Sequence, residues 1–165
     1  MVQRLVVVLV SFVGLVGIWI GGCQTPEQKI EKLISKLQHK NPKVRQTAVV
    51  ALTKMGKDAV PVLIQALQDG SRGIRASAAG VLGQIGSGAV DAMPALIQVL
   101  RDQNPEVRQY AAGALGHIAA VDAVPALMQA LKDQNPKVRN NAAWALEQIG
   151  TPEALKAVEE YQSRQ

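Results

Sequence analysis

The stretch that decides the fold reads DAVPALMQALKDQNPKVR at residues 122–139, and the chain repeats it in near-identical form. Residues 91–108 read DAMPALIQVLRDQNPEVR, and residues 58–75 read DAVPVLIQALQDGSRGIR. A shorter earlier copy keeps Leu-Ile-Ser-Lys-Leu at 33–37 and Asn-Pro-Lys-Val-Arg at 41–45. The leucine-rich segments are spaced by 30, 33 and 31 residues. A period in this range indicates a protein built from stacked supersecondary units.

Each unit predicts two helices. The first begins near Asp-Ala-Val-Pro or Asp-Ala-Met-Pro, where Asp can cap free N–H groups and Pro suits the first turn. The second begins at Asn-Pro, and its apolar positions follow the helical period, as at Val138, Ala142, Ala145, Leu146 and Ile149. The short link between the helices makes them antiparallel, and one such pair cannot bury its own apolar stripe. We therefore expect an all-α fold, an α-solenoid that winds as a right-handed superhelix.

The chain is expected to have two parts. Residues 1–22 form a signal peptide or membrane anchor segment, and residues 23–165 form the repeat domain. The predicted helix pairs and the C-terminal capping helix lie at about 26–56, 58–86, 91–120, 122–150 and 151–165. The composition is 48% hydrophobic but only 3% aromatic, which favours closely packed helices over a β-sandwich.

The N-terminal segment has the layout of a secretory signal. Arg4 precedes an uncharged run over 5–20, and Gly21-Gly22-Cys23 follows directly. The segment resembles a bacterial lipoprotein signal, and the resemblance implies that Cys23 is the lipidated residue. An uncleaved transmembrane helix and a soluble exported product are the alternatives. We expect a membrane-anchored lipoprotein of the cell envelope.

The repeated residues resemble HEAT repeats, specifically the short HEAT-like repeats first associated with phycobilisome lyases, from Pro26 to about Ala157. The resemblance implies a ladder in which Asp and Arg side chains, six residues apart in each unit, tie successive units together. Its members are Asp69, Arg75, Asp102, Arg108, Asp133 and Arg139. The first unit carries His39 in place of Asp, so the ladder is expected to stop there.

Comparison of the units shows which positions of the second helices the fold does not dictate. Aligned on the shared leucine, three columns vary: Thr47/Ser77/Tyr110/Asn141, Val50/Gly80/Gly113/Trp144 and Lys54/Gln84/His117/Gln148. The spacing places the three variable residues of each unit on one helix face, called the variable face here. The resemblance to HEAT repeats implies that this is the concave surface, and we expect it to bind a protein partner. The predicted binding residues are Tyr110, His117, Asn141 and Trp144, with Gly80 and Gly113 leaving room beside them. Alternatively, Trp144 only packs against the last helix near Tyr161.

Charge is distributed unevenly. Residues 23–75 contain ten basic and four acidic residues, a net charge of +6, whereas residues 76–165 carry −2. A stripe predicted on the first helix could rest on anionic headgroups; it consists of Lys29, Lys32, Lys36 and Lys40. A solvated helix face is the alternative reading. Nucleic-acid binding is disfavoured because the basic surface lacks interleaved aromatic residues.

The sequence offers no catalytic arrangement. His39 and His117 lie in different units without neighbouring Glu, and the single cysteine belongs to the signal. The run Gly83-x-x-Gly86-x-Gly88 is not a phosphate loop because no strand precedes it and no Lys-Ser/Thr follows it. We expect no enzyme, cofactor or metal, but a membrane-anchored scaffold or protein-interaction module. The alternative is an accessory protein related to phycobilin lyases that binds a chromophore or its carrier protein.

Overall fold

The computed structural model describes residues 25–164, so the predicted signal segment and Cys23 lie outside the described residues. Within this range the chain forms nine α-helices and no strand. Their bounds are α1 Pro26–Ser35, α2 Pro42–Met55, α3 Val60–Ala66, α4 Arg72–Ile85, α5 Met93–Val99, α6 Pro105–Ile118, α7 Val124–Ala130, α8 Pro136–Ile149 and α9 Pro152–Gln162. The helices form four pairs and a final single helix, which confirms the predicted solenoid.

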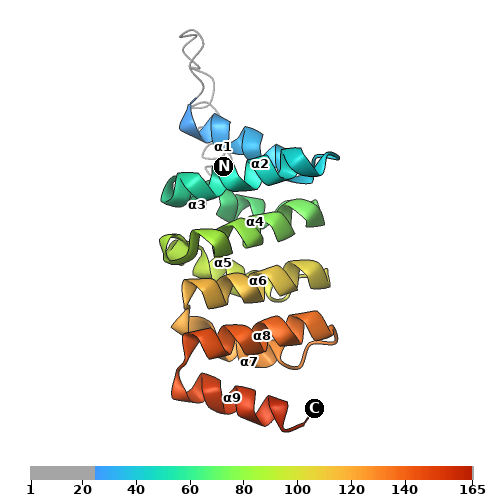
Figure 1. Cartoon of the computed structure of the whole chain (residues 1–165), viewed down its shortest axis with the longest axis vertical. Coiled ribbons are helices and arrows are strands. Elements are labelled where there is room, and N and C mark those ends of the chain that lie inside the picture. Colours follow the sequence, from blue (N-terminus) through green and yellow to red (C-terminus); the bar gives the residue numbers. More distant parts are fainter. Residues whose placement is uncertain (1–24, 165) are drawn as a thin grey trace, which may run out of the picture.

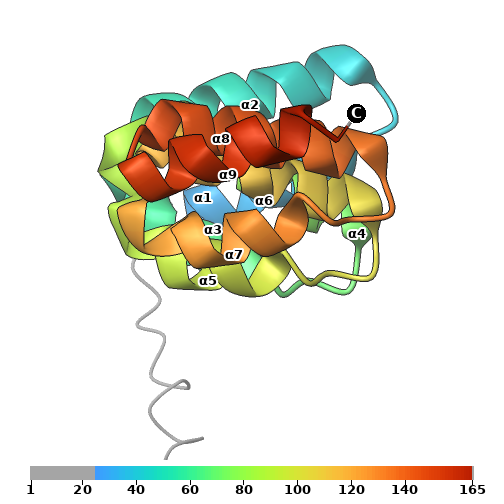
Figure 2. The same ribbon diagram turned by 90° about the horizontal axis from the view of Figure 1, so that it is seen from below.

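The pairs stack along one axis in two layers. In Figure 1 the second helices α4, α6 and α8 lie one above the other, with α5 and α7 behind them. Figure 2 looks along the stack and places α2 and α8 on one side and α5 and α7 on the other. The apolar stripes of the two layers meet between them, where leucines of every pair are fully buried, such as Leu52, Leu82, Leu115 and Leu146. No polar or charged residue is buried among the described residues.

The second helices are capped as predicted in three units. The side chains of Asn41, Asn104 and Asn135 each accept a hydrogen bond from the backbone N–H two residues later. Proline follows each of these caps in the first turn. Ser71 makes no such bond; its hydroxyl instead donates to Gln38 Oε1 at 2.8 Å.

The predicted Asp caps of the first helices are wrong. A 3-10 turn precedes each of these helices, at Gly56–Ala59, Gly86–Ala92 and Val121–Ala123, and it contains the Asp. The first helical N–H already donates to a carbonyl of that turn, as Val60 does to Lys57. No N–H group at this position is left for a carboxylate, and the Asp side chains point to solvent as exposed residues.

Glycines set how closely the second helices approach. A Cβ built on Gly116 would lie 2.8 Å from the Cα of Ala145, and one on Gly83 would lie 3.0 Å from the Cα of Ala114. The absent side chains therefore allow α6 to pack tightly on α4 and α8 on α6, and these are the most extensive helix–helix contacts among the described residues. The corresponding residue of α2 is Thr53, and α2 contacts α4 much less extensively than α4 contacts α6. The Thr53 hydroxyl donates to Gln84 Oε1 at 3.1 Å across this joint.

The predicted lysine stripe on the first helix is shorter than expected. Lys29 and Lys32 lie on α1, Lys36 starts a 3-10 turn, and Lys40 lies beyond both. The chain changes its winding here because it must turn to reach the cap of α2 at Asn41. None of the described helices combines the length and apolar character needed to span a lipid bilayer.

Candidate functional site: the variable face of the second helices

Among the large hydrophobic side chains of the variable face, Tyr110 on α6 is the most exposed. This side chain is 44% exposed, and its ring rests on α4, where a Cβ on Gly80 would lie 3.5 Å from Tyr110 Cδ1. The space predicted beside Gly80 is thus filled by Tyr110 itself. Glycine permits this because it presents no side chain, so the ring can rest on the neighbouring helix while much of it stays exposed.

The same arrangement repeats one helix further along the stack. Asn141 on α8 leans onto Gly113, where a built Cβ would be 3.2 Å from its Oδ1, and its Nδ2 donates to the carbonyl of Lys137. Trp144 lies over Gly116, with a built Cβ only 2.7 Å from Cζ3. Its ring also packs on exposed His117, with the ring centroids 4.8 Å apart and the planes tilted by 59°.

The predicted binding residues therefore fall into two groups. Tyr110 and Gly80 lie between α4 and α6, whereas His117, Asn141, Trp144 and Gly113 lie between α6 and α8. Trp144 has its aromatic contact with His117 of α6, so the structure does not support packing against α9 alone as its role. Whether this face binds a partner, and whether it is the concave one, stay predictions.

The sequence did not predict a groove of about 380 Å³ that opens where α2 stands away from α4. Its floor is α4, from Gly73 through Ser77 and Gly80 to Gln84, and Tyr110 borders it on the α6 side. On the α2 side it is lined by Arg45, Gln46 and Val49. The sequence does contain a feature that could have indicated this groove. Thr53 stands in α2 at the position that is glycine in α4 and α6, at Gly83 and Gly116.

The Asp–Arg ladder is present at two joints. Arg75 donates from Nε and Nη2 to both oxygens of Asp102 at 2.7 and 3.0 Å, and Arg108 grips Asp133 in the same way at 2.7 and 2.8 Å. The third hydrogen-bonding nitrogen, Nη1, holds two backbone carbonyls of the arginine's own unit. Each arginine thus clamps its own loop and the next unit at once.

The remaining ladder members do not pair across units. Asp69 accepts from the N–H of Ser71, and among residues 25–164 neither it nor Arg139 lies within ion-pair distance of an opposite charge. Arg45 likewise has no carboxylate partner in this range, because the less extensive α2–α4 joint keeps Asp69 away from it. The ladder therefore begins at the joint between the second and third units, and Asp69 is not joined to the first unit.

The surroundings of the paired carboxylates change their pKa values. The hydrogen bond from Arg108 lowers the pKa of Asp133, although partial burial opposes this. At Asp102 partial burial alone would raise the pKa, but the hydrogen bonds from Arg75 and the N–H of Asn104, together with the nearby arginine charges, outweigh it and lower the pKa. Both groups are therefore held as carboxylates.

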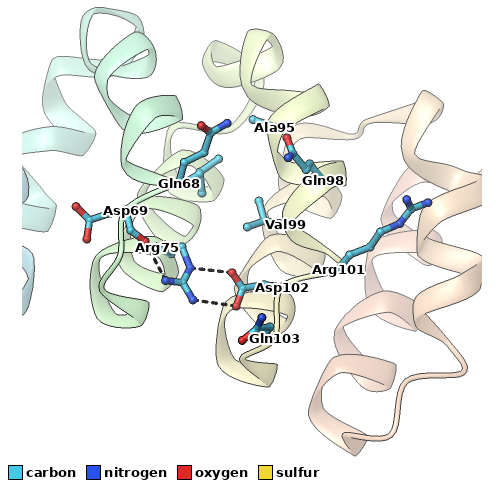
Figure 3. Close-up of a pocket in the computed structure, with 10 residues that line it drawn as sticks. Gln68, Asp69, Arg75, Ala95, Gln98, Val99, Arg101, Asp102 and Gln103 are labelled. Carbon is cyan, nitrogen blue, oxygen red and sulfur yellow. Dashed lines mark hydrogen bonds and ion pairs between the residues drawn. The ribbon is translucent and has the colours of Figure 1, made fainter.

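One ladder pair forms part of a pocket between α3 and α5. This α3–α5 pocket has a volume of about 440 Å³, and Figure 3 shows the Arg75–Asp102 pair at its base with Gln68, Gln98 and Arg101 around it. In this pocket the carboxylate that binds Arg75 is Asp102 of the chain itself. Across residues 25–164, no three His, Cys, Asp or Glu side chains converge as a metal site.

Comparison with known proteins identifies the architecture. The family model described as HEAT repeats matches residues 30–94 and again residues 93–164. The chain belongs to the HEAT-repeat family. A comparison with curated protein sequences gave no match.

Solved structures share this HEAT-repeat fold. The complex of CpcE and CpcF of phycocyanin lyase from Nostoc sp. PCC7120 is similar over 82% of this chain and 86% of that one, at 25% identity and a TM-score of 0.71. Human deoxyhypusine hydroxylase is 32% identical over 76% of this chain, which spans 44% of the hydroxylase, with a TM-score of 0.59. A designed armadillo repeat protein in complex with the peptide (KR)4 is 23% identical over 84% of this chain and 75% of that one, with a TM-score of 0.57, and shares the fold alone.

Proposed function

We propose that this HEAT-repeat chain is a non-catalytic, membrane-tethered module whose variable face binds a protein partner. The observation that carries the proposal is Tyr110, which stays 44% exposed although Gly80 braces one side of its ring. An aromatic side chain that is already held in place loses little conformational freedom on binding, and such residues are enriched at the centres of interfaces. The His117–Trp144 pair offers a second aromatic surface one helix along.

The test is affinity capture from solubilised cell envelope with the wild type and a Tyr110→Ala/His117→Ala variant. Both side chains are exposed, so their removal leaves the core intact. The matched control is Leu155→Ala, which removes a 48% exposed apolar side chain from α9. We expect partners that the wild type and the control retain to be lost from the double variant. Equal retention by all three proteins would reject the variable face as the binding surface.

A second candidate function rests on the similarity to the phycocyanin lyase complex, which extends over most of both chains. In this alternative, the variable face binds a linear tetrapyrrole or its carrier protein, and Tyr110 and His117 contact the chromophore rings. Incubation of the purified protein with a linear tetrapyrrole is expected to shift the absorbance band of the pigment, and the double variant to abolish the shift. An unchanged spectrum with the wild type argues against this function.

We also propose that the membrane surface binds the basic residues of the first unit, which are Lys29, Lys32, Lys36 and Lys40. Each positive charge close to anionic headgroups contributes about 1 kcal/mol to the binding free energy. Neutralisation of these lysines in a protein without its lipid is expected to reduce binding to vesicles rich in anionic lipid. Neutralisation of Lys132, Lys137 and Lys156 at the other end of the solenoid is the control. Equal binding by the two variants would mean that the first four lysines form an ordinary solvated surface.

A further inference from the structure

In each unit the second helix carries, as its fourth residue, an arginine that the same unit holds in one orientation. The Nη1 group of Arg45 donates to the carbonyls of His39 and Lys40 at 2.8 and 3.1 Å, and that of Arg139 donates to those of Asp133 and Gln134 at 2.9 and 3.1 Å. Arg75 and Arg108 make the equivalent bonds. These bonds fix the guanidinium plane, so that the edge with Nε and Nη2 is prepared for a carboxylate.

Among residues 25–164, only the edges of Arg75 and Arg108 receive a carboxylate. The aspartate comes from the turn that follows a seven-residue first helix, as Asp133 does three residues after the end of α7. Helix α9 takes the place of the next first helix but continues for eleven residues instead of turning. Alignment of buried Leu127, Ala130 and Leu131 with Ala154, Ala157 and Val158 places Glu160 where the aspartate belongs.

Glu160 does not fill the position. It is still within α9, and its carboxylate lies 3.8 Å from Arg164 one turn later on the same exposed surface. Among residues 25–164, no carboxylate lies within 4.0 Å of Arg139. The arginine is held by its Nη1 bonds, and no described residue accepts a hydrogen bond from its Nε and Nη2 edge.

The surroundings of that edge form a pocket of about 390 Å³ between α7 and α9. This α7–α9 pocket is the counterpart of the α3–α5 pocket in Figure 3, with Leu131, Lys132 and Arg139 in the places of Leu67, Gln68 and Arg75. Three basic side chains line it, from Lys132, Arg139 and Arg164, against the single acid Glu160. The charge balance favours an anionic occupant.

We propose that the α7–α9 pocket is a carboxylate-binding site, in which Nε and Nη2 of Arg139 receive an Asp or Glu side chain of a partner protein. The two completed joints define the geometry, a bidentate pair with N···O distances of 2.7 to 3.0 Å. A second copy of this chain stacked end to end would not supply the carboxylate, because its first unit carries His39 where the other units carry Asp. The occupant is therefore an acidic segment of a different protein.

The test uses the intact protein and a display library of random linear peptides. We expect peptides that bind the wild type to share an acidic residue, and its replacement by Asn or Gln to weaken binding by about tenfold or more. The same replacement is expected to have no effect with Arg139→Gln, since the two groups act as one pair. Glu160→Gln removes the one competing carboxylate of the pocket and is expected to tighten binding.

Arg164→Gln is the matched control, because it removes the same charge from the same pocket but no anchored guanidinium edge. Its effect is expected to be several times smaller than that of Arg139→Gln, and smaller still at high salt, because exposed charges are screened. Equal effects of the two substitutions, peptides without a shared acid, or no bound peptide would each overturn the proposal. Neither Tyr110 nor His117 lines this pocket, so Tyr110→Ala/His117→Ala tests the variable face alone. Failure of the carboxylate-site proposal and failure of the proposed function are therefore distinguishable.

Discussion

At the scale of single residues, the joints between units depend on a few side chains that act in pairs. Arg108 and Asp133 are only 17% and 12% exposed, and removal of the negative charge leaves the guanidinium desolvated without a partner. Hydrogen bonds to charged groups contribute about 1.5–3 kcal/mol each in such places. We therefore expect Asp133→Asn to lower the free energy of unfolding by about 2 kcal/mol, measured by urea denaturation.

The control for this prediction is Asp69→Asn. Asp69 and Asp133 both accept a hydrogen bond from the N–H two residues later, and an asparagine oxygen can retain that bond in both. Only Asp133 also binds an arginine of the preceding unit. Equal losses from the two substitutions would show that the arginine pair adds nothing to stability.

The same pair makes stability depend on pH in a definite direction. Because Arg108 lowers the pKa of Asp133 in the folded protein, the pair contributes fully above the unfolded pKa of about 3.9. The contribution is lost as the pH falls below that value and through the lower folded pKa. We expect the free energy of unfolding of the wild type to decrease below about pH 4. A smaller decrease is expected for Asp133→Asn, and parallel curves for the two proteins would contradict the assignment.

Two glycines of the second helices are expected to respond to alanine in opposite ways. A Cβ at Gly116 would meet the backbone of Ala145 at 2.8 Å, so Gly116→Ala forces α6 and α8 apart, at a cost of about 1–3 kcal/mol. A Cβ at Gly80 meets only Tyr110 at an ordinary 3.5 Å. Gly80→Ala is therefore expected to stabilise the protein by about 0.5–1 kcal/mol, since glycine is unfavourable within a helix. Thermal unfolding of both variants checks the two signs.

At the scale of helices, the joint between α2 and α4 is weaker than the α4–α6 and α6–α8 joints. It has neither the glycine contact nor the Arg–Asp pair, and α2 buries only Ala48 and Leu52, whereas α6 also buries residues such as Val107, Ala111 and Ile118. Local openings concentrate where few apolar contacts oppose them. We expect backbone amides of α2 to exchange hydrogen faster than those of α6 at equivalent positions, with equal protection contradicting the weak joint.

The helices could be predicted from the sequence because each depends on local signals. The Asn-Pro caps and the apolar period placed α2, α6 and α8 correctly. The Asp caps were wrong because the 3-10 turns satisfy the same N–H groups through the backbone. The groove at Arg45 and the open edge of Arg139 could not be predicted in this way, since both depend on which neighbouring unit reaches a side chain. Thr53, in the place of Gly83 and Gly116, was a readable signal for the first of them.

At the scale of the whole molecule, we propose that the stacked helices are tethered to a membrane through the N-terminal end of the solenoid. The predicted attachment is Cys23, only two residues before the described solenoid begins at residue 25. Metabolic labelling with a radioactive fatty acid is expected to mark the wild type but not Cys23→Ser. Labelling that persists in this variant would remove the lipoprotein interpretation, while a wild type that is itself unlabelled but still in the membrane fraction would favour an uncleaved helix.

The way consecutive units interlock also determines how such an array can change in length during evolution. The third unit offers Gly116 and Arg108 to its successor and presents Ala114 and Asp102 to its predecessor, so a duplicate of it would fit its original on both sides. A duplicate of the first unit would not fit in this way. It has Thr53 in place of the glycine that contacts the next unit, and His39 in place of the aspartate that binds the preceding arginine. Gene duplication can therefore extend this protein from its interior, whereas its first pair of helices is suited only to an end.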